Sequence, residues 1–310
     1  MTATVTNGEA TTVDTKVRRL NDVSAKRVID PDVDVAGALG EGQLLADELL
    51  SIAGLGLVLT PAQRATLSRE EVASITEAGI RFEAVLEAGF ALQITRAPSL
   101  VDPRITYLLH EVGEETRHQR LFVRLLNQLD AKAKNPLSRR PLLWLMARGT
   151  NMIINLPALL YVLVLGGEEI PDLFQKLAGE HPDTDPFLRA VNRYHRQEEA
   201  RHLSFARTVL PEVWADANII ERIAVKFVAP MVIKGMFETL IHPGVYETVG
   251  LPGWKTWKAA NRSAQRVAIR HQAIRPIVAV LLDAGILRRG RVPSAWRDVA
   301  GVDRGGVATS

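Results

Sequence analysis

The sequence predicts an all-α fold, and two observations support this prediction. Apolar residues between about residue 45 and residue 290 recur mostly at helical spacing, and no stretch alternates convincingly with period two over six residues. Helix starts are also marked, because Asp102–Pro103 and Asp185–Pro186 each place an N-cap side chain before a proline that suits a first helical turn. We therefore expect one helical domain over residues 45–290, with a flexible N-terminal arm (1–44) and a flexible tail (291–310).

Individual helices follow from the same spacing. The first is expected over Ser68–Arg96, opening with a capping box formed by Ser68 and Glu71, and the second runs from Pro103 to near Asn135–Pro136. Pro171 lies inside a later helix and should kink it or open a bulge. The further helical stretches are expected over residues 141–148, 156–178, 186–207, 216–240 and 254–287.

Composition excludes several classes of protein. Hydrophobic residues make up 47% and charged residues 24%, which is an ordinary globular balance. The net charge is only +3, and the absence of a Lys/Arg tract argues against nucleic-acid binding. Cysteine is absent, so disulfides, iron–sulfur clusters and thiol nucleophiles are excluded. Any metal must therefore be held by histidine and carboxylate side chains.

The chain shows no sign of a membrane span or a secretory signal. Its first forty residues lack an apolar signal core. The most apolar run, residues 152–165, is shorter than the ~20 residues that a span needs. It is also interrupted by Asn155 and Pro157, so we expect a buried core helix there and a cytoplasmic protein.

Two tetrapeptides share a pattern with chemical meaning. Glu115 precedes His118 by three residues, and Glu199 precedes His202 by three residues. At this offset the two side chains lie on one face of a helix and can bind the same or adjacent metal ions. A single copy is weak evidence, because a solvated Glu beside a half-buried His is the commoner case. Two copies are typical of carboxylate-bridged dimetal bundles, in which each of the other two helices supplies one more Glu.

The position of the third carboxylate follows from helical-hairpin geometry. If the first hairpin turns near Ser99, Glu83 lies 16 residues before the turn and Glu115 lies 16 residues after it. At 1.5 Å per residue the two side chains reach the same height. Glu87 lies one turn along the same face and competes with Glu83, but the register favours Glu83.

The fourth carboxylate follows in the same way from the second hairpin. If this hairpin turns near Asp183, Glu168 lies 15 residues before the turn and Glu199 lies 16 residues after it. Glu169 competes with its neighbour, and the register again favours Glu168.

A further candidate ligand is His195. It lies four residues before Glu199 and seven before His202, so the three form one stripe on a helix. The corresponding place on the other motif helix holds Glu111, so the two halves are not equivalent. The alternative for His195 is a surface position as a partner of Glu199, and we favour metal ligation.

The donor set indicates the metal and the chemistry. Carboxylates with imidazoles and no thiolate suit two iron ions, with manganese as the alternative. Four carboxylates would offset most of the charge of two divalent ions. The apolar run Leu156–Leu165 just before Glu168 would give dry surroundings. These features point to O₂ or peroxide chemistry.

The sequence resembles the non-haem dimetal N-oxygenases typified by p-aminobenzoate N-oxygenase. The resemblance covers roughly residues 45–290 and rests on Glu83 in RFEAVLEAG, on EETRH at 114–118, on Glu168 in GGEEI and on HRQEEARH at 195–202. It implies a ferritin-like bundle that activates O₂ with the help of an electron donor and oxidises a small aryl amine through the hydroxylamine towards the nitro compound. The implied di-iron ligands are Glu83, Glu115, His118, Glu168, His195, Glu199 and His202.

Other functions remain open at this point. The same scaffold could hydroxylate or desaturate a lipid-like substrate, store or detoxify iron and peroxide, or hold a metal only for stability. Arg270 or Arg275 could pair with a substrate carboxylate, although helix charges of this kind usually face solvent. A helical bundle with exposed apolar stripes commonly pairs, so we expect a homodimer.

Overall fold

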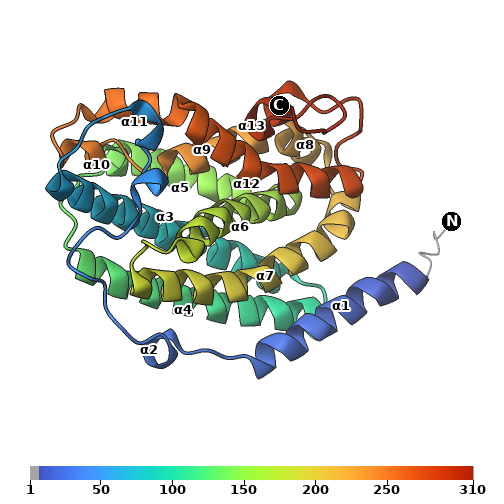
Figure 1. The fold of residues 1–310 in the computed structure, drawn as a ribbon. Helices are drawn as coiled ribbons and strands as arrows, with labels where there is room; N and C mark the ends of the chain where they lie inside the picture. Colours follow the sequence, from blue (N-terminus) through green and yellow to red (C-terminus); the bar gives the residue numbers. More distant parts are fainter. Residues whose placement is uncertain (1–6, 310) are drawn as a thin grey trace.

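Four long helices form the centre of the molecule as two hairpins. The computed structural model describes residues 7–309, with side chains from Thr12 onward. α3 (Pro61–Arg96) packs along α4 (Pro103–Leu129), and α6 (Pro157–Glu180) packs along α7 (Pro186–Ala215). The two hairpins lie side by side (Figure 1). Within the described residues the only β pairing is an isolated bridge between Val302 and Ala308, which confirms the all-α prediction.

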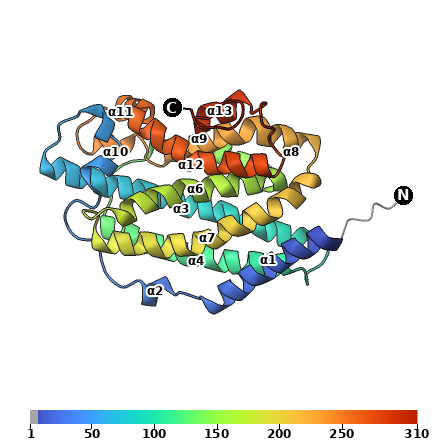
Figure 2. The same cartoon turned by 45° about the vertical axis from the view of Figure 1, so that its right-hand side comes forward.

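Shorter helices surround this centre. α12 and α9 pack on α6, α1 packs on α4 and α7, and α13 packs on α12 (Figure 2). These helices and the remaining ones are α1 (Asn7–Lys26), α2 (Pro31–Asp34), α5 (Arg140–Ile154), α8 (Ile219–Ile223), α9 (Ala229–Thr239), α10 (Gly244–Glu247), α11 (Gly253–Arg262), α12 (Ala264–Asp283) and α13 (Ser294–Ala300).

The expected caps hold for two of the central helices. The Asp102 side chain accepts a hydrogen bond from the Arg104 amide, and the Asp185 side chain accepts one from the Leu188 amide. Each is followed by the expected proline in the first turn, where the missing N–H costs nothing. The second helix ends at Leu129, earlier than expected, with Asp130 in the left-handed conformation.

The predicted start of the first helix is wrong. α3 begins at Pro61, and its capping box is formed by Thr60 and Gln63. Ser68 and Glu71 lie within the helix and bind the preceding segment: the Ser68 hydroxyl accepts from the Leu44 amide, and Glu71 accepts from the amide and hydroxyl of Ser51. They hold the chain before the helix rather than capping it.

Two expected helices are divided. The 216–240 stretch contains α8, a π-helical turn over Ala224–Val228, and α9, whereas the 254–287 stretch breaks at Ser263 between α11 and α12. The apolar run 152–165 is also broken, near Asn155, so its first residues end α5 and the rest begin α6. Pro171 lies inside α6 without ending it.

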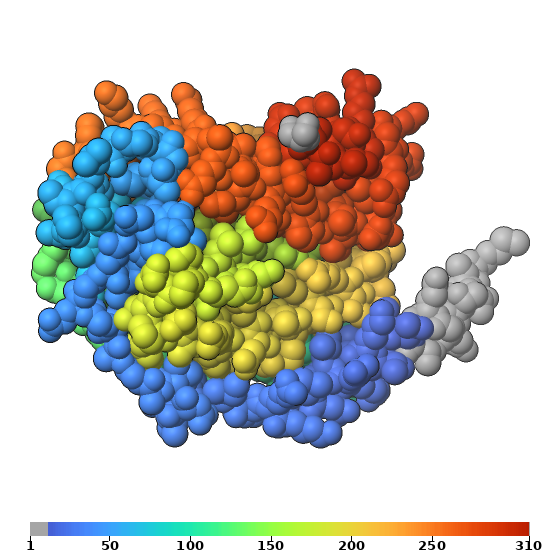
Figure 3. All heavy atoms as spheres, in the orientation of Figure 1, coloured from blue at the N-terminus to red at the C-terminus, as the bar shows by residue number. Residues whose placement is uncertain are grey.

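The terminal regions contain regular structure where flexible segments were expected. α1 places Val17 in the core, and α13 does the same with Trp296 and Val299. Figure 3 shows the N-terminal part in blue along the lower and left edges of the molecule, against the helices drawn in yellow and green. Val13, Val17 and Leu20 of α1 follow the i, i+4, i+7 spacing of one helix face, a short period that was missed in the sequence, and they pack against the core. Residues 1–6 lie outside the described residues.

α6 is the most deeply buried helix, because every residue from Ala158 to Ile170 is buried. Among the described residues, no single helix is long and apolar enough to cross a membrane; α5 and α6 meet that test only jointly, as a pair bent by 117°.

Glu71 gives the fold a testable dependence on pH. Burial raises the pKa of Glu71 to about 7, even though hydrogen bonds from Ser51 and the charge of Arg266 act in the opposite direction. Because the folded-state pKa lies above the unfolded value, this group stabilises the fold fully below pH ~4.5, and the contribution is lost as the pH rises through 7. We expect Glu71→Gln to remove roughly 3 kcal/mol of pH dependence between pH 4.5 and 8. Urea unfolding at several pH values across this range measures the free energy of unfolding of both proteins. The prediction would be contradicted if this free energy changed with pH equally in wild type and variant.

Candidate metal centre

The structure brings the seven predicted site residues together between the two hairpins. All are buried, and their ligand atoms form two groups, within each of which the atoms lie no more than 4.8 Å apart. The first group contains Glu83 from α3, His118 from α4 and His195 from α7, and the second contains Glu115 from α4, Glu168 from α6, and Glu199 and His202 from α7.

Two carboxylates reach both groups. Glu115 places Oε2 3.3 Å from Nδ1 of His118 and Oε1 3.3 Å from Nδ1 of His202. Glu199 places Oε1 3.2 Å from Nδ1 of His118 and Oε2 3.0 Å from Nδ1 of His202. Each carboxylate therefore presents one oxygen to each imidazole, which is the arrangement a pair of bridging carboxylates requires.

His195 lies inside this cluster, which rules out the surface alternative. Its Nε2 is 3.2 Å from Oε1 of Glu83 and 3.3 Å from Oε1 of Glu199. Its Nδ1–H donates to the side-chain oxygen of Gln175 at 3.1 Å, and the Phe122 ring stacks on the imidazole. Gln175 thereby fixes the tautomer that leaves the Nε2 lone pair facing the carboxylates.

The competing carboxylates have other partners. Glu87 accepts a hydrogen bond from the Thr116 hydroxyl, and Glu169 pairs with Arg207. Neither belongs to the two ligand-atom groups. Glu111, at the position equivalent to His195, is buried, and burial raises its pKa to about 8.

Two further carboxylates orient the histidines and were missed in the sequence. His118 donates from Nε2–H to Oε2 of Glu198 at 3.0 Å, and His202 donates from Nε2–H to Oε2 of Glu114 at 2.8 Å. The pairs cross between α4 and α7, so each motif helix orients the histidine of the other. Both pairs leave Nδ1 facing the ligand groups, and such outer partners fix the tautomer and orientation of metal-binding histidines.

Two arginines compensate for these outer carboxylates. Arg201 lies 2.9 Å from Oε1 of Glu114 and 3.3 Å from Oε1 of Glu198, and Arg117 lies 3.6 Å from the same oxygen of Glu198. Burial alone would raise the pKa of Glu114, but His202 and Arg201 outweigh it and lower that pKa to about 2. The signal was present in the sequence, because both motifs read Glu-Glu-x-Arg-His, at 114–118 and 198–202.

Two of the four inner carboxylates, Glu83 and Glu168, lack this compensation, whereas at Glu115 and Glu199 burial is outweighed by the neighbouring histidines, which lower the pKa of both groups. Burial, together with neighbouring carboxylates, raises the pKa of Glu83 and of Glu168 well above the usual range. Within the described part of the chain, each inner carboxylate also has a buried oxygen that accepts no hydrogen bond: Oε2 of Glu83 and Oε1 of Glu115, Glu168 and Glu199. Buried acceptors of this kind are uncommon without a partner. Two divalent cations would supply the missing partners and balance four carboxylates.

A cavity of about 700 Å³ opens onto the centre. Glu83, Glu168 and His195 form part of its wall, and most of the other lining side chains are apolar. Arg270 and Arg275 are not among the residues that line it. Arg270 lies 3.8 Å from Glu238, and Arg275 donates to the carbonyl oxygen of Ala300, so neither faces the cavity as a carboxylate partner.

Gly167 allows α6 to approach α3 directly beside Glu168. A methyl group at Gly167 would overlap the tip of the Phe82 ring. We expect Gly167→Ala to force this ring aside and to lower the free energy of unfolding by about 1–3 kcal/mol. Gly235→Ala is the matched control, since it adds a methyl in α9 with no atom within 4 Å, and it should be neutral or stabilise by about 0.5–1 kcal/mol. Thermal unfolding of both variants tests this, and equal stabilities would contradict it.

Comparison with known proteins gives one family match. The family model described as p-aminobenzoate N-oxygenase AurF matches residues 10–285. Uncharacterized proteins from Mycobacterium bovis and Mycobacterium tuberculosis are each 28% identical over 172 residues, which is 55% of this chain. The matched region spans about half the length of these relatives, 50% in each case.

Proposed function

Because the chain belongs to the p-aminobenzoate N-oxygenase AurF family, we propose that it is a di-iron oxygenase that uses O₂ to oxidise the nitrogen of an aryl amine. The observation that carries this proposal is the pair of buried ligand groups spanned by Glu115 and Glu199. A storage protein would not need the apolar cavity beside the centre, so that cavity favours an enzyme.

We assign the ligands by proximity. One ion would be held by Glu83, His118 and His195, and the other by Glu168 and His202. The carboxylates of Glu115 and Glu199 would bridge the two ions. Iron suits this oxygen-rich set with imidazoles, and manganese is the alternative. When bound, the metals would supply the electrons and Lewis acidity that O₂ activation requires.

The chain's own groups prepare the centre. Glu198 and Glu114 hold the Nε2 protons of His118 and His202, and Gln175 holds the Nδ1 proton of His195. These partners fix the orientation of the three imidazoles, and a bound metal ion would take the ligand-side nitrogen in place of a proton. The apolar wall would exclude water once a substrate fills the cavity, which would strengthen the electrostatic interactions inside it.

The proposed reaction needs an external reductant. One atom of O₂ enters an N–H bond of the amine to give the hydroxylamine, and the other leaves as water after two electrons and two protons arrive from the donor. The donor, a homodimeric assembly and a cytoplasmic location remain predictions from the sequence.

Product analysis tests the proposal. The protein is loaded anaerobically with ferrous iron, its metal content is measured, and aryl amines are supplied with O₂ and reductant. We expect two metal ions per chain and a product heavier than the amine by oxygen on nitrogen. One ion or none per chain would refute the dimetal assignment, and oxygen only on carbon would favour a hydroxylase.

Replacing a bridging carboxylate should abolish the centre. We expect Glu115→Ala or Glu199→Ala to lose one or both metals and all oxidation, because each removes a ligand from both ions. Glu87→Ala and Glu169→Ala are matched controls, since these carboxylates have partners outside the ligand groups. Elemental analysis and turnover are the measurements. Two metal ions per chain in Glu115→Ala would contradict the assignment of Glu115 as a bridging ligand.

His195→Ala should separate metal binding from reactivity. Six ligands remain, so we expect most of the metal to be retained, whereas turnover and the absorbance change after mixing the reduced protein with O₂ should differ from wild type. Stopped-flow absorbance measures this change. Traces that match wild type would place His195 outside the coordination sphere.

A further inference from the structure

The cavity beside the centre differs in character from a site for a small anion. Its volume of about 700 Å³ falls within the range of pockets that hold drug-sized ligands, so a single-ring compound would leave much of it empty. The apolar side chains that line it include Leu86, Phe122, Leu163, Phe174 and Met236.

Three hydroxyl groups of the wall are committed to the protein itself. The hydroxyls of Ser74, Thr76 and Thr239 donate to the carbonyl oxygens of Leu240, Val72 and Gly235 at 2.7–2.8 Å. The other polar side chains of the wall away from the metal centre include Ser138, Thr150 and Asn192, which carry no charge and could hydrogen-bond a substrate but could not balance an anion.

The charges of the wall disfavour an anion. Among the described lining residues the one Lys or Arg is Arg81, and it is exposed to solvent. Glu71 and Glu77 also line the cavity and would repel a carboxylate when ionised. Burying a carboxylate without a cationic partner is costly, so a benzoate-type substrate has no favourable position for its anionic end.

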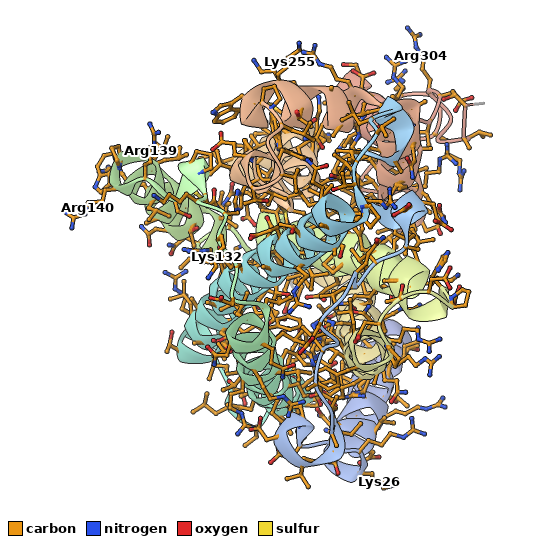
Figure 4. All side chains as sticks on the ribbon, turned by 60° about the vertical axis from the view of Figure 1, so that its left-hand side comes forward. Lys26, Lys132, Arg139, Arg140, Lys255 and Arg304 are labelled. Atoms are coloured by element: carbon orange, nitrogen blue, oxygen red, sulfur yellow. The ribbon has the colours of Figure 1, made fainter. Side chains whose placement is uncertain are left out.

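The cavity extends from the centre to α5. Leu142, Leu143, Met146 and Ile153 of this helix line it, and no residue of α5 is buried. Figure 4 shows Arg139 and Arg140, at the start of α5, pointing away from the body of the molecule. An apolar molecule can therefore reach from His195 to the inner face of this exposed helix.

Building on the proposed function, we infer that the substrate is an uncharged, lipophilic amine with an extended apolar body, and not a carboxylate-bearing amine. The nitrogen lies at the metal centre, and the apolar body fills the cavity towards α5. Recognition comes from burial of apolar surface rather than from an ion pair.

Binding of three probes to the purified metal-containing protein, without reductant, tests the inference by calorimetry. Ethyl 4-aminobenzoate should bind at least about 10-fold more tightly than 4-aminobenzoate, because only the acid loses the hydration of a charge. 4-Hexylaniline should bind at least about 100-fold more tightly than 4-aminobenzoate, because binding removes its hexyl chain from water. Equal or tighter binding of 4-aminobenzoate would overturn the inference.

A matched pair of variants locates the binding site. Gly149 in α5 lines the cavity, and Gly235 in α9 does not; a Cβ at either position would have no atom within 4 Å. We expect Gly149→Phe to weaken 4-hexylaniline binding at least about 10-fold, since the ring fills the cavity. Gly235→Phe should leave binding unchanged, and an unaltered affinity in Gly149→Phe would also overturn the inference.

Oxidation of the bound probe is scored separately. If 4-hexylaniline binds as expected but its nitrogen is not oxidised with O₂ and reductant, the proposed reaction fails, whereas the inferred class of ligand that the cavity binds stands.

Discussion

Seven glutamate side chains are buried between the two hairpins, and the fold must compensate for their charge. An isolated buried carboxylate is too costly to remain ionised without a partner. The structure meets this constraint in two layers for six of them, and burial raises the pKa of the seventh, Glu111, to about 8. Arg117 and Arg201 compensate for the outer pair, Glu114 and Glu198. The inner set has histidines and orphaned oxygens, so it requires added cations. The buried glutamates are Glu83, Glu111, Glu114, Glu115, Glu168, Glu198 and Glu199.

The sequence predicted the inner set because hairpin geometry ties height to residue number. Counting from the turns separated Glu83 from Glu87, and the structure places only Glu83 in the cluster. The outer set could not be predicted in this way, because a charged residue beside a motif usually belongs to a solvated face. Only the crossing of α4 and α7 shows that Glu114 orients His202.

The central helices were predictable because their apolar faces are long and their starts carry Asp–Pro caps. The terminal helices were not. Val17 and Trp296 are buried by contacts with helices distant in the sequence, and the local signal at Val17 is a single stripe of three apolar residues in an otherwise polar segment. The prediction of a helix N-cap at Ser68 was also wrong, because the Ser68 hydroxyl accepts a tertiary hydrogen bond from the Leu44 amide instead of capping a helix.

The exposure of α5 has a consequence for the dynamics of the molecule. Local opening of a protein segment costs little free energy where few side chains are buried, and approaches the free energy of global unfolding where the core is continuous. α5 has no buried residue, whereas α6, directly after it, is buried throughout Ala158–Ile170. Amide hydrogens of α5 should therefore exchange with solvent through small local fluctuations, while those of α6 exchange only when the whole bundle unfolds. The cavity thus has one wall, α5, of low local stability, and another wall, α6, that opens only when the core unfolds.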